Sequence, residues 1–145
     1  MDNRTFTLIK PEAVAAGNTG KILDAILGAG FRLRALKMVS LTRNRAEKFY
    51  AVHRERPFYE KLIGYMTSGP VIAAVLEKDN AVADFRRLAG NTDPARAEEG
   101  TLRRRFGTDT RHNAVHASDS DEHAREEWEQ FFTETEITNT DYSGA

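Results

Sequence analysis

The sequence predicts an α/β protein of the α+β kind: a ferredoxin-like βαββαβ sandwich with helices covering a four-stranded antiparallel sheet and a long loop before the last strand. Two observations support this fold class. Four short segments carry apolar patterns typical of strands, and segments of helical periodicity separate them. The chain has 145 residues, 40% of them hydrophobic and 30% charged, which suits one domain with one core. We expect a single domain over residues 1–145, ending in a polar tail over about 133–145.

The first half of the chain alternates strand and helix signals. Residues 4–9 alternate apolar and polar side chains, as in a strand, and a broad apolar stripe over 19–29 predicts a helix. Residues 31–41 predict a second strand, and the apolar phase shifts in its middle, so we expect an irregularity there. Thr42 is expected to cap the next helix, and Pro57 is expected to open the one after it.

The second half repeats this alternation. Residues 71–76 are continuously apolar, which is typical of a strand buried on both faces. Asp79 or Asn80 is expected to cap the following helix, Val115 lies in a short apolar piece that predicts the last strand, and Ser120 is expected to cap a final helix.

A polar stretch over residues 90–113 precedes the last predicted strand. It contains the triplet Arg103-Arg104-Arg105, together with Arg96 and Arg111. Loops of this length in compact domains are uncommon and are usually functional or disordered. From the stretch alone, a solvated charged loop and an anion-binding loop are both open.

The composition excludes several classes of protein. A formal net charge of -1 gives no global field that favours nucleic acid or an anionic membrane, so neither is an expected partner. The absence of cysteine removes disulfides and thiolate chemistry and is compatible with a reducing compartment. No apolar run approaches the ~20 residues that span a bilayer, and the first residues lack the pattern of an export signal. We therefore expect a cytoplasmic protein.

Two motifs suggest sites that their details do not support. The stretch "GNTGKI" at 17–22 has two residues between its glycines where a phosphate-binding loop needs four, and Ile22 stands where the magnesium-binding Ser or Thr belongs. His112 and His116 have the spacing of metal ligands, but Asn113 follows the first one where a zinc protease carries Glu. We expect a turn and helix start in the first case and no histidine metal site in the second.

His116 has the setting of a reacting imidazole. It lies between a short apolar strand and a turn, 117–120, that leads into a helix whose first N–H groups favour anions. A neutral imidazole is a competent nucleophile at neutral pH, and a carboxylate on its other ring nitrogen would fix the tautomer. Glu127 could supply that carboxylate if the final helix folds back along the strand. Surface or boundary positions explain His53 and His123.

Four motifs, in order and spread over nearly the whole chain, resemble the nucleoside diphosphate kinase family. The segment 113–119, "NAVHASD", is similar to the family's N-x-x-H-[G/A]-S-D signature. "TLIKPEAV" at 7–14 is similar to the family's first strand and the lysine-proline after it. "RPFYEKLIGYMTSGPV" at 56–71 and "NTDPARAEEGTLRRRF" at 91–106 resemble the nucleotide-clamping helices and the long loop.

The resemblance implies an enzyme that transfers the γ-phosphate of a nucleoside triphosphate, typically ATP, to a nucleoside diphosphate and so maintains NTP and dNTP pools. It implies a ping-pong route in which Nδ1 of His116 attacks the γ-phosphorus and becomes phosphohistidine. Glu127 matches the glutamate that orients the ring, and Ser118 matches a hydroxyl beside that pair.

The resemblance also implies a nucleotide-binding set. The matched phosphate, ribose and base positions are Lys10 (phosphate and ribose), Tyr50, Arg86, Thr92 and Arg103 (phosphates), Asn113 (ribose), Phe58 and Leu62 (base) and Thr110 (outer side of the base). Stacking on an aromatic ring tolerates any base, because every base has a π-face. Thr110 replaces a branched apolar residue, Phe49 stands where many members carry histidine, and Ala117 replaces the commoner glycine.

The expected partners are nucleoside tri- and diphosphates such as ATP, GTP and GDP. Mg²⁺ is the expected cofactor, carried on the nucleotide's own phosphates rather than held by protein side chains. A homo-oligomer, a tetramer or a hexamer, is also expected from the resemblance.

The sequence leaves two alternatives to an active kinase, an RNA-binding module and a catalytically silent family member. A ferredoxin-like RNA binder would need aromatic pairs on exposed strands, and "KMVSL" and "VIAAVL" offer none. A catalytically silent member of the family is hard to reconcile with a chain that keeps the nucleophile and every matched phosphate ligand.

Overall fold

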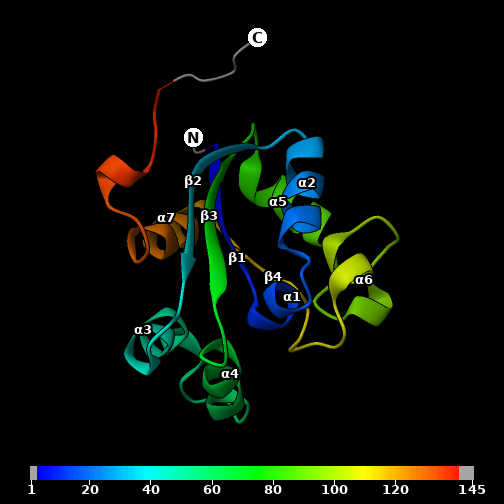
Figure 1. The fold of residues 1–145 in the computed structure, drawn as a ribbon, viewed down its shortest axis with the longest axis vertical. Helices are drawn as coiled ribbons and strands as arrows, with labels where there is room; N and C mark the ends of the chain where they lie inside the picture. Colours follow the sequence, from blue (N-terminus) through cyan, green and yellow to red (C-terminus); the bar gives the residue numbers. More distant parts are fainter. Residues whose placement is uncertain (1–2, 141–145) are drawn as a thin grey trace.

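The computed structural model describes residues 3–140, and its strands form one four-stranded sheet in the order β2-β3-β1-β4 with antiparallel neighbours throughout. The elements are β1 (Arg4–Ile9), α1 (Pro11–Ala15), α2 (Thr19–Gly28), β2 (Arg32–Val39), α3 (Arg43–Phe49), η1 (Ala51–His53), α4 (Tyr59–Met66), β3 (Val71–Glu77), α5 (Ala81–Ala89), η2 (Pro94–Arg96), α6 (Leu102–Phe106), β4 (Val115–Ala117), α7 (Asp121–Glu129) and η3 (Glu134–Glu136), where η denotes a 3₁₀ helix. This order is that of the predicted ferredoxin-like sandwich, so the predicted fold class is confirmed (Figure 1).

The sheet lies between two layers of helices. In Figure 1, α3 and α7 lie on one side of the strands, and α1, α2, α5 and α6 lie on the other. Each side has its own apolar core: Phe6, Leu8 and Ile63 belong to the first, whereas Ile26 and Phe85 belong to the second. All five of these side chains are 0% exposed. Alternation along the central strand β1 therefore divides the apolar residues between the two faces.

Strand β1 is the structural centre, because it pairs with both β3 and β4. Its register with β4 places Leu8 opposite His116, and Thr7 donates its hydroxyl hydrogen to the His116 carbonyl at 2.7 Å. The middle of the three-residue strand β4 is thus fixed against the buried residues 5–9 of β1.

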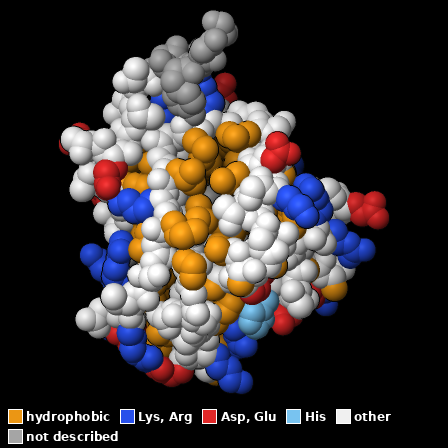
Figure 2. All heavy atoms as spheres, in the orientation of Figure 1, with side chains coloured by type: hydrophobic (Ala, Val, Ile, Leu, Met, Phe, Trp, Pro, Cys, Tyr) orange, Lys and Arg blue, Asp and Glu red, His pale blue; other side chains and the backbone are white. Residues whose placement is uncertain are grey.

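Strand β2 has the predicted irregularity. The register with β3 shifts between Leu33 and Ala35, which changes the face on which the following side chains lie. Leu36 and Met38 are consequently 49% and 61% exposed. Figure 2 shows apolar side chains gathered along the middle of the molecular face in view, where β2 runs in Figure 1.

Several local predictions are confirmed and others need correction. The Thr42 and Ser120 side chains accept the backbone N–H of the residue three positions on, as N-caps do. Asn80 occupies the N-cap of α5, but in a left-handed conformation and without a side-chain cap bond. The helix expected at Pro57 begins at Tyr59. Helix α1, directly after β1, was not predicted, because its five residues are too few to show a period.

The prediction of one long irregular loop over residues 90–113 is wrong. This stretch contains η2 and α6, and Leu102 at the start of α6 is fully buried. The Thr101 hydroxyl caps α6 by accepting the Arg104 N–H. A buried leucine and a cap therefore make a helix out of a segment whose composition is dominated by arginine.

The residues after α7 pack back on the sheet as far as they are described. The Thr138 N–H donates to the Arg34 carbonyl at 2.9 Å, and the Lys37 ammonium lies 2.9 Å from the Glu136 carboxylate. Residues 141–145 of the predicted tail lie outside the described residues. Within residues 3–140, no helix is both long enough and apolar enough to cross a membrane.

Candidate active site

The final helix returns toward β4 and brings a carboxylate to His116. Nε2 of His116 lies 2.8 Å from Oε1 of Glu127, and the Ser118 hydroxyl donates to the same oxygen at 2.5 Å. Ser120 caps α7 at the turn, and Ala124, one turn before Glu127, is fully buried. The cap and the buried alanine fix the direction of the helix, so that Glu127 faces the strand that carries His116.

This pairing leaves Nδ1 as the reactive nitrogen. A carboxylate that accepts from Nε2–H favours the tautomer with a lone pair on Nδ1. Among residues 3–140, Nδ1 of His116 has no hydrogen-bond partner. The ring is also held by packing, because the Phe49 ring meets it edge-on with 5.1 Å between centroids and an interplanar angle of 76°. The Phe6 ring centroid is 6.3 Å away.

His116 lies in a cleft of about 830 Å³. The predicted residues that line the cleft come from every part of the chain: Lys10, Tyr50, Phe58, Leu62, Arg86, Thr92, Arg103, Thr110, Asn113, His116 and Glu127. The structure thus brings together all the predicted site residues except Ser118, which lies behind Glu127.

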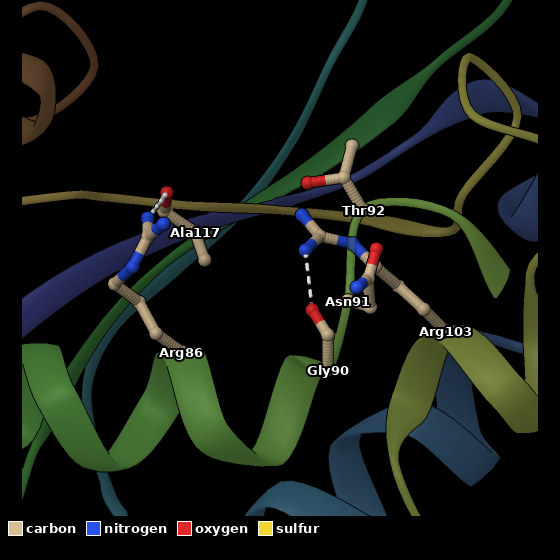
Figure 3. Close-up of a pocket in the computed structure, with 6 residues that line it drawn as sticks. All are labelled: Arg86, Gly90, Asn91, Thr92, Arg103 and Ala117. Atoms are coloured by element: carbon tan, nitrogen blue, oxygen red, sulfur yellow. Dashed lines mark hydrogen bonds between the residues drawn. The ribbon is translucent and has the colours of Figure 1, made fainter. Parts of the chain in front are cut away.

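One end of the cleft is strongly cationic. Arg86 from α5 and Arg103 from α6 reach toward β4 from two sides, with Thr92 beside them, around a side pocket of about 200 Å³ (Figure 3). Arg103 donates to the Gly90 carbonyl at 2.8 Å and to the Val115 carbonyl at 3.0 Å, while its buried Nε has no partner among the described residues. Burial and the charge of Arg86 lower the pKa of Arg103 to about 10. Two guanidinium groups held together in this way favour an anion between them.

Gly90 permits this arrangement. It has φ +88°, and a Cβ there would lie 2.6–3.0 Å from three side-chain atoms of Thr101. Only glycine fits a position that combines this backbone conformation with so close an approach.

Lys10 and Asn113 form the floor of the cleft. The Lys10 ammonium donates to Oδ1 of Asn113 at 2.7 Å, and Nδ2 of Asn113 donates to the carbonyls of Thr92 and Thr110 at 3.2 and 3.0 Å. Burial, and to a lesser extent the charge of Arg103, lowers the pKa of Lys10 to about 7. The lysine therefore loses much of its charge near neutral pH when no anion compensates it.

The opposite end of the cleft is aromatic. Phe58 is 39% exposed, and Leu62 lies one turn further along α4. Tyr50 is buried, and its hydroxyl has no hydrogen-bond partner among the described residues. Burial and the Glu127 charge raise the pKa of Tyr50. This end offers a face for a planar apolar ring and one unused phenol donor.

Several residues that line the cleft were not predicted as site residues, and three of them carry titratable groups in contact with one another or with predicted residues. These three are His53, Asp119 and His123, although surface or boundary positions had been expected for both histidines. The His53 ring centroid lies 5.7 Å from that of Phe58, and Nδ1 of His123 lies 2.5 Å from the Asp119 carboxylate. The closeness of Asp119 and His123 to His116 in the sequence could have indicated them, whereas His53 carries no such signal because η1 meets β4 and α7 only in the folded molecule.

The metal alternative for the His112 and His116 pair receives no geometric support. Nδ1 of His112 lies 3.0 Å from the Asp109 carboxylate, whereas His116 contacts Glu127. In the described part of the chain, no group of three or more His, Asp or Glu side chains could hold a metal ion.

Comparisons with known proteins show the family to which the chain belongs. A family model described as "Nucleoside diphosphate kinase" matches residues 3–137. A nucleoside diphosphate kinase of Flavobacterium psychrophilum is 54% identical over 122 residues, 84% of this chain and 88% of that protein. The Pasteurella multocida enzyme is 53% identical over 134 residues, 92% of this chain and 96% of that protein.

Solved structures show the same fold. The Aquifex aeolicus nucleoside diphosphate kinase superposes with a TM-score of 0.91 at 45% identity, covering 94% of this chain and 99% of that chain. A halophilic enzyme from Halobacterium salinarum, in complex with CDP, gives a TM-score of 0.94 at 34% identity, covering 99% and 96%. The chain belongs to the nucleoside diphosphate kinase family and is an enzyme of nucleotide metabolism with nucleoside diphosphate kinase activity.

Proposed function

We propose that His116 carries the phosphoryl group in a two-step, ping-pong reaction between nucleotides. In the first step, Nδ1 attacks the γ-phosphorus of a nucleoside triphosphate such as ATP. The N–P bond forms as the bond to the bridging β,γ-oxygen breaks, and the diphosphate leaves. In the second step, a terminal oxygen of another diphosphate attacks that phosphorus, the N–P bond breaks, and a new triphosphate leaves. The observation that supports this role is the 2.8 Å contact between Glu127 and Nε2, which leaves Nδ1 for the cleft.

In this proposal, Glu127 positions the ring and stabilises its charge. When Nδ1 becomes bonded to phosphorus, the proton on Nε2 stays and the ring gains positive character. The Glu127 carboxylate lies where that charge develops and needs no rearrangement to meet it. Ser118 donates to the same carboxylate oxygen and so holds its direction.

The cationic end is the proposed phosphate site. Phosphoryl transfer spreads negative charge over several oxygens, and catalysis depends on positioned donors around them. Lys10, Arg86, Arg103, Thr92 and Tyr50 supply such donors beside His116. An incoming triphosphate would also stabilise the charged form of Lys10, whose burial otherwise disfavours it.

The aromatic end is the proposed nucleoside site. Phe58 would stack on the base, with Leu62 and Thr110 beside it, and Asn113 would contact the ribose. Stacking is indifferent to base identity, which supports the use of ATP, GTP, GDP and other nucleotides. The CDP bound to the Halobacterium salinarum relative supports a nucleotide as the occupant of this cleft.

We propose that Mg²⁺ enters as part of the nucleotide substrate. The donors at the phosphate end are cationic side chains, which fit phosphate oxygens and repel a metal ion. Bound to those oxygens, Mg²⁺ would neutralise charge that develops during transfer.

Self-association and a cytoplasmic setting also belong to the proposal. Leu27, Leu36 and Met38 are exposed apolar side chains on α2 and β2, which supports a homo-oligomer, expected from the family resemblance to be a tetramer or hexamer. Sedimentation analysis tests the number of subunits. A cysteine-free chain is compatible with the reducing cytoplasm, where nucleotide pools turn over.

Incubation with γ-³²P-ATP and Mg²⁺, followed by a GDP chase, tests the central step. We expect an acid-labile, base-stable label that the chase removes as labelled GTP. His116→Ala should take no label, whereas His112→Ala should be labelled at saturating ATP. An unlabelled wild type, or a labelled His116→Ala protein, would overturn the assignment.

A further inference from the structure

A ring contact outside the cleft joins its two nucleoside-facing walls. One wall is α4 with the preceding Phe58, here the helix wall; the other is residues 107–113, here the loop wall. Tyr65 of the helix wall and His112 of the loop wall meet with 4.6 Å between ring centroids and an interplanar angle of 65°. Neither residue lines the cleft. The contact therefore acts on the cleft only through its walls.

Tyr65 is anchored on its other side. Its hydroxyl donates to the carboxylate of Glu12 on α1, and burial together with this carboxylate raises the pKa of Tyr65. Glu12 is two positions after Lys10, the lysine on the cleft floor. In Figure 1, α1 and α4 lie at the same end of the sheet as the segment that enters β4. Tyr65 thus links the helix wall to the segment that carries Lys10.

His112 is anchored as firmly within the loop wall. The Asp109 carboxylate lies 3.0 Å from Nδ1 of His112 and accepts the backbone N–H groups of Arg111 and His112 at 3.0 and 2.8 Å. These bonds lower the pKa of Asp109 to about 2. The His112 carbonyl accepts the Thr108 N–H at 2.6 Å. Residues 108–112 therefore form one tightly hydrogen-bonded turn, with Asn113 directly after it.

We propose that the Tyr65–His112 contact sets the separation of the two walls, and with it the affinity of the cleft for the nucleoside part of its substrates. The inference rests on the proposed function, since it takes the cleft as the nucleotide site. Both residues are positioning residues: Tyr65 acts through Leu62, one turn earlier on α4, and His112 acts through Thr110 and Asn113.

The proposal separates binding from chemistry. His116, Glu127 and the two arginines are held by β4, α7, α5 and α6, and none of these contacts involves Tyr65 or His112. If the ring contact is lost, the base cannot touch Phe58 and the loop wall at once, while His116, Glu127 and the two arginines keep their geometry. Nucleotide affinity should therefore fall while the rate of phosphoryl transfer at saturation stays the same.

The experiment is a double-mutant cycle of Tyr65→Leu, His112→Ala and the double variant. The readouts are the Kd for ADP and the rate of phosphoenzyme formation at saturating ATP. Each single variant should raise the Kd about 2- to 12-fold, the effect of losing one aromatic pair. The Kd of the double variant for ADP should be no higher than that of the weaker-binding single variant, because the two substitutions remove the same contact. The phosphorylation rate should stay within about 2-fold of wild type.

Two further variants separate the ring contact from its anchors. Tyr65→Phe keeps the ring and loses the bond to Glu12, so it should lie between wild type and Tyr65→Leu. Asp109→Asn keeps an acceptor for the loop N–H groups and both rings, so its Kd should match wild type. Thermal melts verify that each variant is folded.

Multiplicative effects of the two single variants on the Kd, or a fall in phosphorylation rate instead of affinity, would overturn the inference while leaving the proposed function standing. Absence of a His116-dependent phosphoenzyme in the wild type would overturn the proposed function itself. The two failures are therefore distinguishable in one set of measurements.

Discussion

Oε1 of Glu127 lies 2.8 Å from Nε2 of His116, although the two residues are 11 positions apart and belong to different elements. The same oxygen accepts the Ser118 hydroxyl. A single carboxylate oxygen therefore determines both the tautomer of the imidazole and the direction in which its other nitrogen faces. It does so only because α7 folds back along the central strand.

Replacement of that carboxylate should affect the chemical step. Glu127→Ala leaves Nε2 without its partner and removes the charge that meets the developing imidazolium, so phosphoenzyme formation should slow about 100-fold. The Kd for ADP should change less than about 2-fold, because Glu127 faces the ring rather than the nucleotide. Rapid-quench single-turnover kinetics and equilibrium dialysis measure the two quantities. A normal rate with weakened binding would contradict the positioning role.

Loss of the exposed aromatic ring should weaken every nucleotide alike. Phe58→Leu removes a stacking surface but keeps an apolar side chain, so binding should weaken by about 1–3 kcal/mol. The loss should be similar for ADP, GDP, CDP and UDP. Calorimetric titration with the four diphosphates measures it, and Phe58→Tyr, which keeps the ring, is the matched control. A loss confined to purines or to pyrimidines would show that the ring reads the base rather than stacking on it.

Replacement of Lys10, whose ammonium group is buried, should stabilise the folded protein and abolish its binding of nucleotides. The pKa of Lys10 is about 7 in the folded protein and 10.5 in its ordinary state. The folded state therefore binds fewer protons between these values, and the cost of burying the charge is complete below pH 7 and disappears as pH rises toward 10.5. Lys10→Met should raise the free energy of unfolding by roughly 1–4 kcal/mol at pH 6.

Urea unfolding from pH 6 to pH 10 tests this dependence on pH. The stability advantage of Lys10→Met over wild type should shrink steadily as pH rises, and ADP should not protect the variant. An advantage that grows with pH would show that the lysine is not the group whose burial is costly.

Arg86 should contribute more to nucleotide binding than to the stability of the fold. It makes long contacts with the carbonyls of Ala117 and Ser118, at 3.3 and 3.4 Å, and its charge lowers the pKa of Arg103. Arg86→Gln relieves that repulsion, so the melting temperature without nucleotide should not fall. Wild type at 100 times the Kd of ADP should gain about 2.7 kcal/mol, and the variant at the same concentration should lose most of that gain. Thermal melts with and without ADP measure both effects.

The fold could be predicted from the sequence where local chemistry determines the outcome. Thr42 and Ser120 cap helices through their own hydroxyls, and the shifted apolar phase of β2 marks a real change of register. Helix α6 could not be predicted in this way. Three of its five residues are arginines, and what makes it helical is the burial of Leu102 against other elements.

In the candidate site, too, local features could be predicted from the sequence and contacts between distant segments could not. His116 and Glu127 could be proposed as a pair, because a turn between a strand and a capped helix is a local feature. His53 could not be placed beside the cleft, since no spacing in the sequence reports that η1 meets β4 and α7. The contact between Tyr65 and His112 joins residues 47 positions apart by packing alone.

The pairing of strand β1 affects how the enzyme folds during its synthesis. Strand β1 is the first strand synthesised, yet it pairs with β3 and β4, and its buried face is completed by residues on and after α7. The nucleophile on β4 and its carboxylate on α7 also lie late in the chain. A nascent chain still short of β4 therefore has a central strand without one of its partners and a cleft without His116, and a chain short of α7 lacks Glu127. Catalytic activity in this fold should appear on the ribosome in a single step, late in synthesis, instead of growing with chain length.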